Sequence, residues 1–240
     1  MRRVDQLLSS LGYCSRKEAQ GLCDEGRVRL DTEIKAPGGD DVGGLIVDDA
    51  SRRVDPSKLR LDDQPLDFPD GLLVMMHKPV GLVCSHDTGE GQRVYDLLPE
   101  RWERRDPKVN TIGRLDKDTS GLILLTDQGP LVQKFTSPKH HVDKVYVATL
   151  DREPGPEVAE AFARGLELQE ANERVKTLPA TVRLLGSRRI EVTLREGKYH
   201  QVRRMFAALG LHVEVLERTR FGPWELGDLP AGEWRALPLP

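Results

Sequence analysis

One stretch near the middle of the chain, GRLDKDTSGLILLTDQG at residues 113–129, concentrates side chains that could do chemistry. Asp116 and Asp118 are separated by a single residue, small polar residues follow them, and an apolar run comes next. Carboxylates at this spacing can coordinate a cation, attack a phosphoryl group or attack another electrophile. Three kinds of site are therefore compatible with the stretch.

A calcium loop needs oxygen ligands at fixed positions of a segment of roughly 12 residues. Asp116, Asp118 and Ser120 fit the first three ligand positions, and Gly121 fits the glycine position. Leu124, however, stands where a ligand or a water-holding residue is required. The preceding segment VNTIGR is also a poor helix, so the sequence disfavours calcium.

The acid pair Asp116-Lys117-Asp118 also resembles the pair of magnesium-dependent phosphatases that form an aspartyl phosphate. Such a pair is expected at the end of a buried apolar strand. The four residues before Asp116 are IGRL, a poor buried strand, and the apolar run follows the acids instead. This interpretation is disfavoured as well.

Further motifs lie on either side of the stretch. HKPVGLVCS at 77–85 indicates a strand followed by a turn, KVY at 144–146 places Tyr146 in a β-branched run, and EGKYHQVRRMF at 196–206 places Arg203 near the start of a helix. Taken singly, Tyr146 could be a core tyrosine and Arg203 a surface arginine. The motifs become informative when their order is considered.

In this order, the motifs resemble those of the pseudouridine synthases of the RsuA and RluA superfamily. GRLDKDTSGLILLT matches the catalytic loop of the family almost letter for letter, with Asp116 at the position of the invariant aspartate. Tyr146 and Arg203 match the tyrosine and the basic residue of the other motifs. The resemblance implies an isomerase that converts a uridine of RNA to pseudouridine and needs no cofactor and no metal.

This reaction breaks the bond between ribose C1′ and N1 of the base and rejoins the base through C5. The enzyme must therefore supply a nucleophile, a dry pocket and a hold on the detached base. We expect Asp116 to be the nucleophile, toward either C6 or C1′, with the guanidinium of Arg203 against its carboxylate. We expect uracil to stack on Tyr146, and His200 and Gln201 to order their loop.

The N-terminal residues predict two short helices and a strand. Val4, Leu7, Leu8 and Leu11 form one apolar stripe that Gly12 can end, SRKE at 15–18 is a capping box, and GRVRLDTEI at 26–34 alternates like a strand bent near Asp31-Thr32. This order resembles the S4 RNA-binding module. Residues 36–57 are interpreted as an acidic, glycine-rich insertion before a last strand at 59–61.

Basic residues in these elements and in the catalytic motifs are the expected RNA contacts, although a solvated helix face is the alternative for Arg16, Lys17 and Arg27. They are Arg2, Arg3, Arg16, Lys17, Arg27, Arg114, Lys198 and Arg204.

Proline, glycine and acids cluster in DDQPLDFPDG at 62–71, a composition typical of a linker. We therefore predict a small S4-like α/β RNA-binding domain at 1–66, a linker at 67–71 and a catalytic domain at 72–240. The catalytic domain is predicted to be α+β, with a mixed, mostly antiparallel sheet flanked by helices. Its expected strands are 72–79, 122–126, 144–150, 180–185 and 189–194, and its expected helices are 156–165 and 200–210.

The overall composition adds few constraints. The net charge of -3 conceals an acidic segment at 40–70 and a basic one at 195–220, and a local basic face is enough to bind RNA. The three cysteines form no C-x-x-C pair, and no apolar run or signal sequence suggests a membrane or export, so we expect a cytoplasmic protein.

The resemblance is to the RsuA branch, which acts on ribosomal RNA, and it implies a monomer acting on 16S rRNA or on a ribosome assembly intermediate. A 23S rRNA enzyme of the same family and a non-catalytic rRNA-binding assembly factor are the alternatives.

Overall fold

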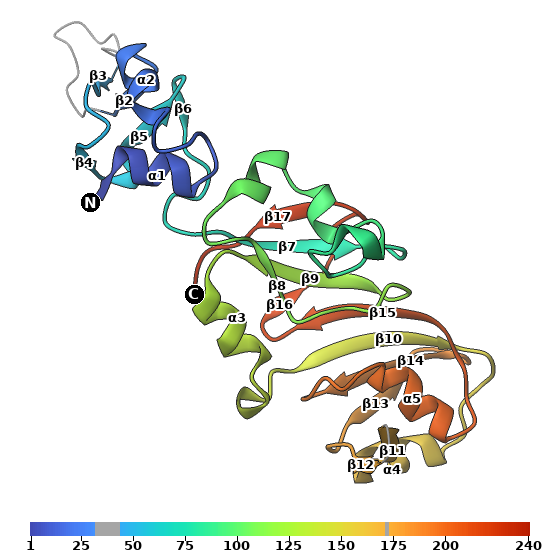
Figure 1. The fold of residues 1–240 in the computed structure, drawn as a ribbon. Coiled ribbons are helices and arrows are strands. Elements are labelled where there is room, and N and C mark those ends of the chain that lie inside the picture. Colours follow the sequence, from blue (N-terminus) through green and yellow to red (C-terminus); the bar gives the residue numbers. More distant parts are fainter. Residues whose placement is uncertain (32–43, 171–172) are drawn as a thin grey trace, which may run out of the picture.

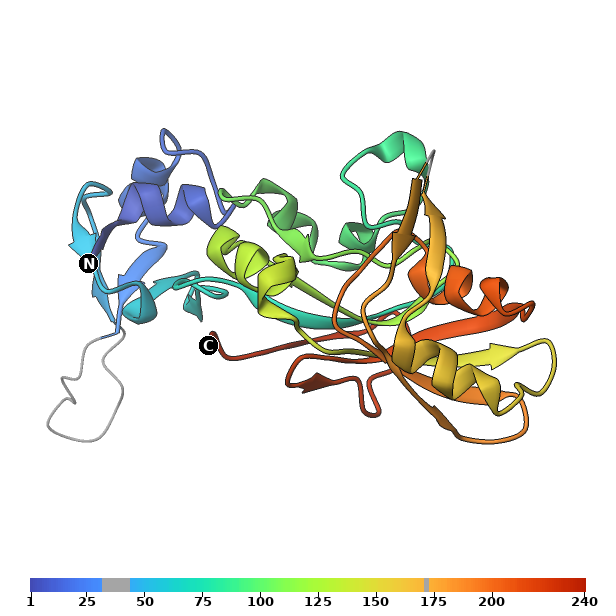
Figure 2. The same cartoon turned by 90° about the horizontal axis from the view of Figure 1, so that it is seen from below.

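The computed structural model describes residues 1–31, 44–170 and 173–240. In the described part of the chain, nine strands form one large mixed sheet, and smaller sheets form an N-terminal module and a separate hairpin. The N-terminal module and the helices α4 and α5 lie at opposite ends of an elongated molecule, with the large sheet between them (Figures 1 and 2).

The N-terminal module packs two short helices against a small sheet. Its apolar core includes Val4, Leu7, Leu8 and Leu11, which confirms the predicted stripe. The capping box is also confirmed, since Ser15 N donates to Glu18 Oε2 over 2.7 Å and Glu18 N donates to Ser15 Oγ over 3.3 Å. The elements are β1 (Arg2–Arg3), α1 (Val4–Ser10), α2 (Ala19–Asp24), β2 (Val28–Leu30), β3 (Leu45–Ile46), β4 (Arg53–Val54), β5 (Leu59–Leu61) and β6 (Gln64–Pro65).

Residues 36–43 of the expected insertion and the bend at Thr32 lie outside the described residues. The remainder of the insertion, 44–57, belongs to the module. It forms β3 and β4, and it buries Val47, Ala50 and Val54 against the helices.

The large sheet confirms the predicted α+β class. Its strand order is β13-β14-β10-β15-β9-β7-β17, with β8 and β16 attached to β9 and β15. Only β9 and β15 run parallel among the described pairs. The strands are β7 (Leu73–Lys78), β8 (Asn110–Ile112), β9 (Ser120–Thr126), β10 (Lys144–Leu150), β13 (Thr181–Leu184), β14 (Arg189–Leu194), β15 (Val213–Phe221), β16 (Trp224–Glu225) and β17 (Trp234–Ala236).

Helices cover this sheet, and a charged hairpin stands beside it (Figure 1). The helices α4 and α5 bury Phe162 and Phe206 in one core cluster, where the ring centroids are 4.9 Å apart. The bounds are α3 (Gly129–Thr136), α4 (Glu157–Arg164) and α5 (Gln201–Ala208), with the hairpin formed by β11 (Glu167–Glu170) and β12 (Glu173–Lys176). Short 3₁₀ helices span Pro56–Lys58, Thr88–Glu90, Val94–Leu97, Glu100–Arg104 and Pro138–His140. No helix in the described ranges is long and apolar enough to cross a bilayer.

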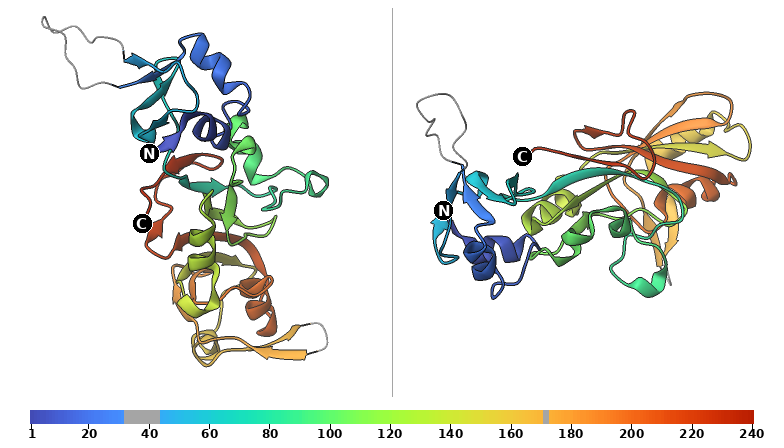
Figure 3. Two further views of the ribbon diagram at one scale, coloured as in Figure 1. Left: turned by 60° about the vertical axis from the view of Figure 1, so that its left-hand side comes forward. Right: turned by 90° about the horizontal axis from the view of Figure 1, so that it is seen from above.

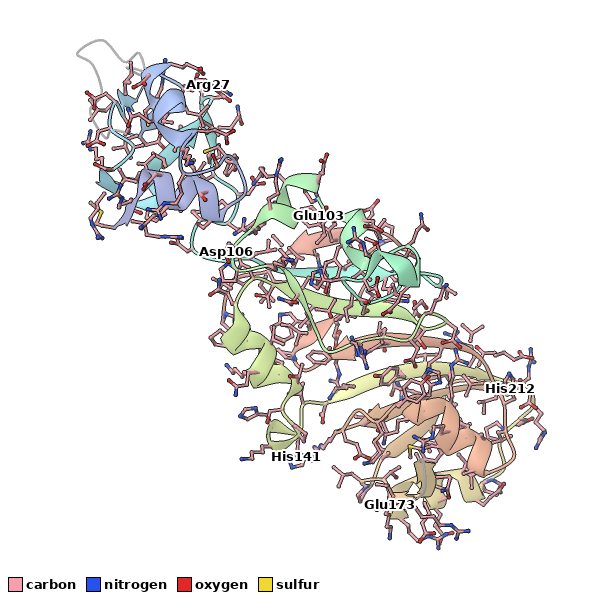
Figure 4. The ribbon with its side chains drawn as sticks, viewed as in Figure 1. Arg27, Glu103, Asp106, His141, Glu173 and His212 are labelled. Carbon is pink, nitrogen blue, oxygen red and sulfur yellow. The ribbon has the colours of Figure 1, made fainter. Side chains whose placement is uncertain are left out.

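The N-terminal module contacts the rest of the chain through specific bonds. Arg101 places its guanidinium 4.0 Å from the centroid of the Tyr13 ring, and Asp106 N donates to Ser10 O over 2.9 Å. Gly12 has a φ of +79°, and a Cβ there would lie 2.5 Å from Arg101 O, so only glycine fits this approach. Figure 4 shows Asp106 at this junction and Arg27 on the far side of the module, and Figure 3 shows the ribbon of the module and of the rest of the chain from two other directions.

A buried ion pair fixes the segment that joins the two parts. Arg105 donates from Nε and Nη2 to Asp127 Oδ2 over 3.0 and 2.8 Å, and also to the carbonyls of Asp67 and Phe68. The second carboxylate oxygen of Asp127 accepts from Leu72 N over 2.8 Å. The side chains of this pair are only 1% and 6% exposed, so neither charge can be solvated if its partner is lost.

We therefore expect Arg105→Met to lower the free energy of unfolding by about 3 to 5 kcal/mol, because it leaves the carboxylate of Asp127 buried without its cation. Chemical denaturation measures this. The matched control is Arg164→Met, which removes an exposed pair with Glu160 and should change stability by less than about 0.5 kcal/mol. Equal midpoints for the two variants would contradict a stabilising role for the buried pair.

Candidate active site

A pocket of about 500 Å³ opens beside the loop between β8 and β9. Its walls come from that loop, from the segment after α3, from β10 and β15, and from the loop 195–200 that leads into α5. Asp116, Tyr146, Arg114 and Lys198 all line it, so the structure brings together four residues predicted from three separate motifs. Arg203 is not among the lining residues.

The loop that carries Asp116 is fixed from beneath by Lys78. This lysine is fully buried, and its Nζ donates to Thr119 O over 2.7 Å, to Pro79 O over 3.1 Å and to Lys117 O over 3.5 Å. Burial lowers the pKa of Lys78, while nearby anionic groups, including Asp116, oppose that shift. The lysine of the K-P-x-G motif thus holds the backbone on both sides of Asp118.

The structure also excludes the calcium interpretation. The later part of the supposed calcium loop, from Ser120 onward, forms β9, and the segment before Asp116 contains the strand β8 rather than a helix. The ligand positions of that loop therefore cannot surround one cation.

The side chain that contacts the Asp116 carboxylate is not the expected Arg203 but His200. His200 Nε2 lies 3.4 Å from Asp116 Oδ1, and the two side chains are 36% and 32% exposed. His200 adopts a left-handed conformation, with φ of +48°, at the start of α5, and its ring stacks on Tyr199 with centroids 3.9 Å apart. This conformation turns the imidazole toward the carboxylate at the pocket.

Arg203 pairs with Asp118, two residues beyond the expected partner Asp116. Its Nη2 lies 3.0 Å from Asp118 Oδ2 and donates to Asp118 O, while its Nη1 donates to Val213 O over 2.7 Å. Arg203 was predicted to contact the Asp116 carboxylate, and it contacts the carboxylate of Asp118 instead, two residues further along the loop. The physical reason is that the carbonyls of Val213 and Asp118 accept hydrogen bonds from Arg203 and hold its guanidinium beside Asp118.

Gln201 orders the loop before α5, as the sequence predicted. Its side chain is buried, accepts from Lys198 N over 2.8 Å and donates to Glu196 Oε1 over 2.7 Å. Lys198 Nζ lies 3.6 Å from Glu196 Oε2. The loop that forms one wall of the pocket is therefore held by its own side chains.

Tyr146 and a residue that the sequence analysis missed, Arg218, form the inner wall. They are cross-strand partners on β10 and β15, and both line the pocket. Tyr146 is partly buried, whereas Arg218 is only 1% exposed, and its Nε donates to Leu122 O over 2.8 Å. Nothing in VEVLERTRF, at 213–221, distinguishes Arg218 from the other charged residues of that run.

A second cation missed by the sequence analysis, Lys144, lies on the same side of the sheet. Burial lowers the pKa of Lys144, and the neighbouring positive charge of Arg218 lowers it further. Its Nζ donates to Val142 O over 3.0 Å and lies 5.5 Å from the centroid of the Phe221 ring. The pocket thus combines the carboxylates of Asp116 and Glu196 with several cationic side chains and apolar ones.

The predicted RNA contacts of the N-terminal module are partly neutralised by acids. Arg3 and Arg16 pair with Asp5, and Arg27 pairs with Asp62 and Glu25. The others are placed as follows: Arg2 donates to Ser10 Oγ and Pro69 O, Lys17 is exposed, Arg114 is exposed at the pocket, and Arg204 donates to the carbonyls of Tyr199 and Gln169. The structure brings only Arg114 and Lys198 of this set to the pocket.

Comparison with known proteins agrees with this fold and identifies the family. Residues 72–208 match the family model for RNA pseudouridylate synthase, and residues 2–38 match that for the S4 domain. The chain belongs to the RNA pseudouridylate synthase family, whose members are isomerases that act on RNA.

Individual relatives match most of the chain. The chain is similar to ribosomal small subunit pseudouridine synthase A of Vibrio parahaemolyticus, with 38% identity over 98% of this chain and 95% of that protein. It is also similar to the protein of the same name from Escherichia coli K12, with 40% identity over 82% and 84% of the two chains. A crystal structure of a pseudouridylate synthase matches with a TM-score of 0.65 and 32% identity, covering 99% of this chain and 96% of that one.

The role of Lys78 in holding the loop can be tested by Lys78→Met. We expect kcat for pseudouridine formation to fall by about 10- to 100-fold, because displacement of the Asp116 loop by even an ångström costs rate at that scale. RNA affinity should change far less. Lys117→Met is the matched control, since that side chain is exposed on the same loop, and it should keep kcat. A Lys78→Met protein with unchanged kcat would contradict the role of Lys78.

Proposed function

We propose that this chain converts one uridine of 16S rRNA to pseudouridine, with Asp116 as the nucleophile. The observation that carries the proposal is the convergence of Asp116 and Tyr146 on one pocket of about 500 Å³, whose lining also includes the cationic side chains of Arg114, Lys198 and Arg218. That volume lies within the range of about 300 to 1,000 Å³ typical of small-molecule sites. A nucleoside can be enclosed there.

The chain's own residues suit each need of the reaction. Asp116 is half-buried at the pocket and lies on a loop held by Lys78, so its carboxylate can meet a reacting atom without reorganising. Tyr146 offers a ring for stacking and a hydroxyl able to assist transfer of the C5 proton. The isomerisation adds and removes nothing, so these groups require no cofactor.

Arg203 is proposed to act through Asp118. Its guanidinium ties α5 to the loop through the side chain and the carbonyl of Asp118, and to β15 through Val213 O. Three of the elements that border the pocket are thereby fixed to one another by a single side chain. Arg203 is in this account a positioning residue for Asp116 rather than its direct partner.

A uridine within folded RNA must leave its stack to enter the pocket, which costs a few kcal/mol. Contacts to phosphates offset that cost without reading sequence. We assign these contacts to Arg114 and Lys198 at the pocket and to the N-terminal domain, at 1–66, through Arg2 and Lys17. Arg3, Arg16, Arg27 and Arg204 would contribute only where their acidic or carbonyl partners allow.

The choice of 16S rRNA rests on the names of the relatives, which are small-subunit enzymes over nearly the whole chain. We propose that the protein works as a monomer in the cytoplasm, on rRNA or on an assembly intermediate of the small subunit. A 23S rRNA target would require a different RNA to reach the same pocket. A non-catalytic assembly factor would have no need of a nucleophile held in place beside Tyr146.

The direct test is Asp116→Asn, assayed on a 16S rRNA transcript and on small-subunit assembly particles. We expect loss of pseudouridine formation by at least about 10³-fold, because the amide cannot attack, with RNA affinity kept within a few-fold. Asp118→Asn is the comparison, since its side chain faces Arg203, and it should retain more activity. Turnover by Asp116→Asn, or equal losses in the two variants, would refute Asp116 as the nucleophile.

A further inference from the structure

Arg218 is the most deeply buried charged side chain of the pocket wall. It is 1% exposed and lies on β15, where its Cα is opposite Tyr146 of β10 on one side and Gly121 of β9 on the other. Its Nε donates to Leu122 O over 2.8 Å, and its Cζ lies 5.0 Å from the centroid of the Phe221 ring. These contacts fix the plane of the guanidinium.

One end of this fixed group is left without a partner. Arg218 Nη2 is buried and has no hydrogen-bond acceptor among the described residues. A buried donor on a charged group lowers stability when it has no acceptor, so the unpaired Nη2 of Arg218 needs an explanation. Because Arg218 lines the pocket, the simplest explanation is that an acceptor arrives with the substrate.

The position of Arg218 favours a base over a phosphate as that acceptor. Directly opposed residues of neighbouring antiparallel strands have Cβ atoms about 4.5 to 5.5 Å apart, so a ring stacked on Tyr146 lies within reach of Arg218 and can present its edge to the guanidinium. Phosphates carry full charge and stay near solvent, where the exposed Arg114 and Arg195 line the pocket. The acceptors that a uracil edge offers are its carbonyl oxygens O2 and O4.

Uracil has a symmetry that suits one fixed donor. In the reaction the C1′–N1 bond breaks, the C1′–C5 bond forms, and a proton leaves C5 while N1 gains one. A half-turn of the detached ring about the axis through N3 and C6 exchanges N1 with C5, and it also exchanges O2 with O4. A donor that faces one carbonyl before the turn therefore faces the other carbonyl afterwards.

We propose that Arg218 donates to a carbonyl oxygen of the flipped uracil in both orientations, and so retains the ring while it is detached from the ribose. This inference rests on the proposed function of the pocket. The same contact excludes cytosine in one orientation, because its amino group presents donors where uracil presents O4. Arg218 is thereby a base-binding and specificity-determining residue.

The test compares the wild-type protein with Arg218→Met and Arg218→Lys on an rRNA transcript that carries uridine, 2-thiouridine or 4-thiouridine at the target position. Sulfur accepts hydrogen bonds more weakly than oxygen. We expect Arg218→Met to slow pseudouridine formation by roughly 10- to 100-fold, the worth of a hydrogen bond from a charged donor, and to release free uracil. Both thio substitutions should slow the wild-type protein, and neither should slow Arg218→Met any further.

Arg220→Met, on the same strand but outside the pocket lining, is the matched control and should release no uracil. The proposal would be overturned if the thio substitutions slowed Arg218→Met as much as they slow the wild-type protein. It would also be overturned if Arg218→Met released no uracil. If Arg218→Met fails to fold by circular dichroism, Arg218→Lys is judged by the same criteria, and a wild-type protein indifferent to both thio substitutions also overturns it. A wild-type protein inactive on every rRNA would instead refute the proposed function itself.

Discussion

The site depends on a short parallel contact between β9 and β15. Only two residue pairs define its register, Ser120 with Glu217 and Gly121 with Arg218. This contact joins β9, which follows the Asp116 loop, to β15, which pairs in turn with β10, the strand that carries Tyr146. Gly121 has a φ of +108°, and a Cβ there would lie 2.3 Å from Arg218 O, so the approach requires glycine. The glycine of the T-S-G motif thus allows the nucleophile and the stacking ring to share one pocket.

Charge is distributed around this contact in a way that fits the chemistry. Lys78 is buried under the Asp116 loop, and its ammonium group donates hydrogen bonds to backbone carbonyls, so it supports the loop in a fixed position. Arg218 keeps a donor for the pocket, while Arg114 lies exposed at it. Basic residues therefore serve different purposes at this site. Lys78 and Arg218 are equally buried, but Lys78 is paired within the protein, whereas Arg218 has a donor that no described residue satisfies.

The sequence predicted those elements whose side chains follow a clear period. The strands at 144–150 and 189–194 have the predicted bounds, because each is a run of apolar and β-branched residues. The first helix followed from one stripe of leucines and a valine. Strand β15 was missed because charged residues interrupt it, and Arg218 was missed with it. That strand is stabilised by pairing with β10 on one side and β9 on the other. This pairing depends on distant parts of the chain and cannot be predicted from the residues VEVLERTRF alone.

Local patterns also failed to identify the partner of Arg203. The motifs place it near the Asp116 loop, but whether it reaches Asp116 or Asp118 depends on the orientation of α5, which Val213 O and Asp118 fix together. Long-range geometry of this kind comes from packing rather than from spacing.

The most direct test of the central claim is a crystal structure of the Asp116→Asn protein bound to an rRNA fragment that contains the target uridine. The account requires the flipped uracil to lie against the Tyr146 ring, with the side chain at position 116 about 3 to 3.5 Å from C1′ or C6, the separation expected of reacting atoms. A target nucleotide bound outside this pocket, or one whose reacting carbons face away from position 116, would contradict it.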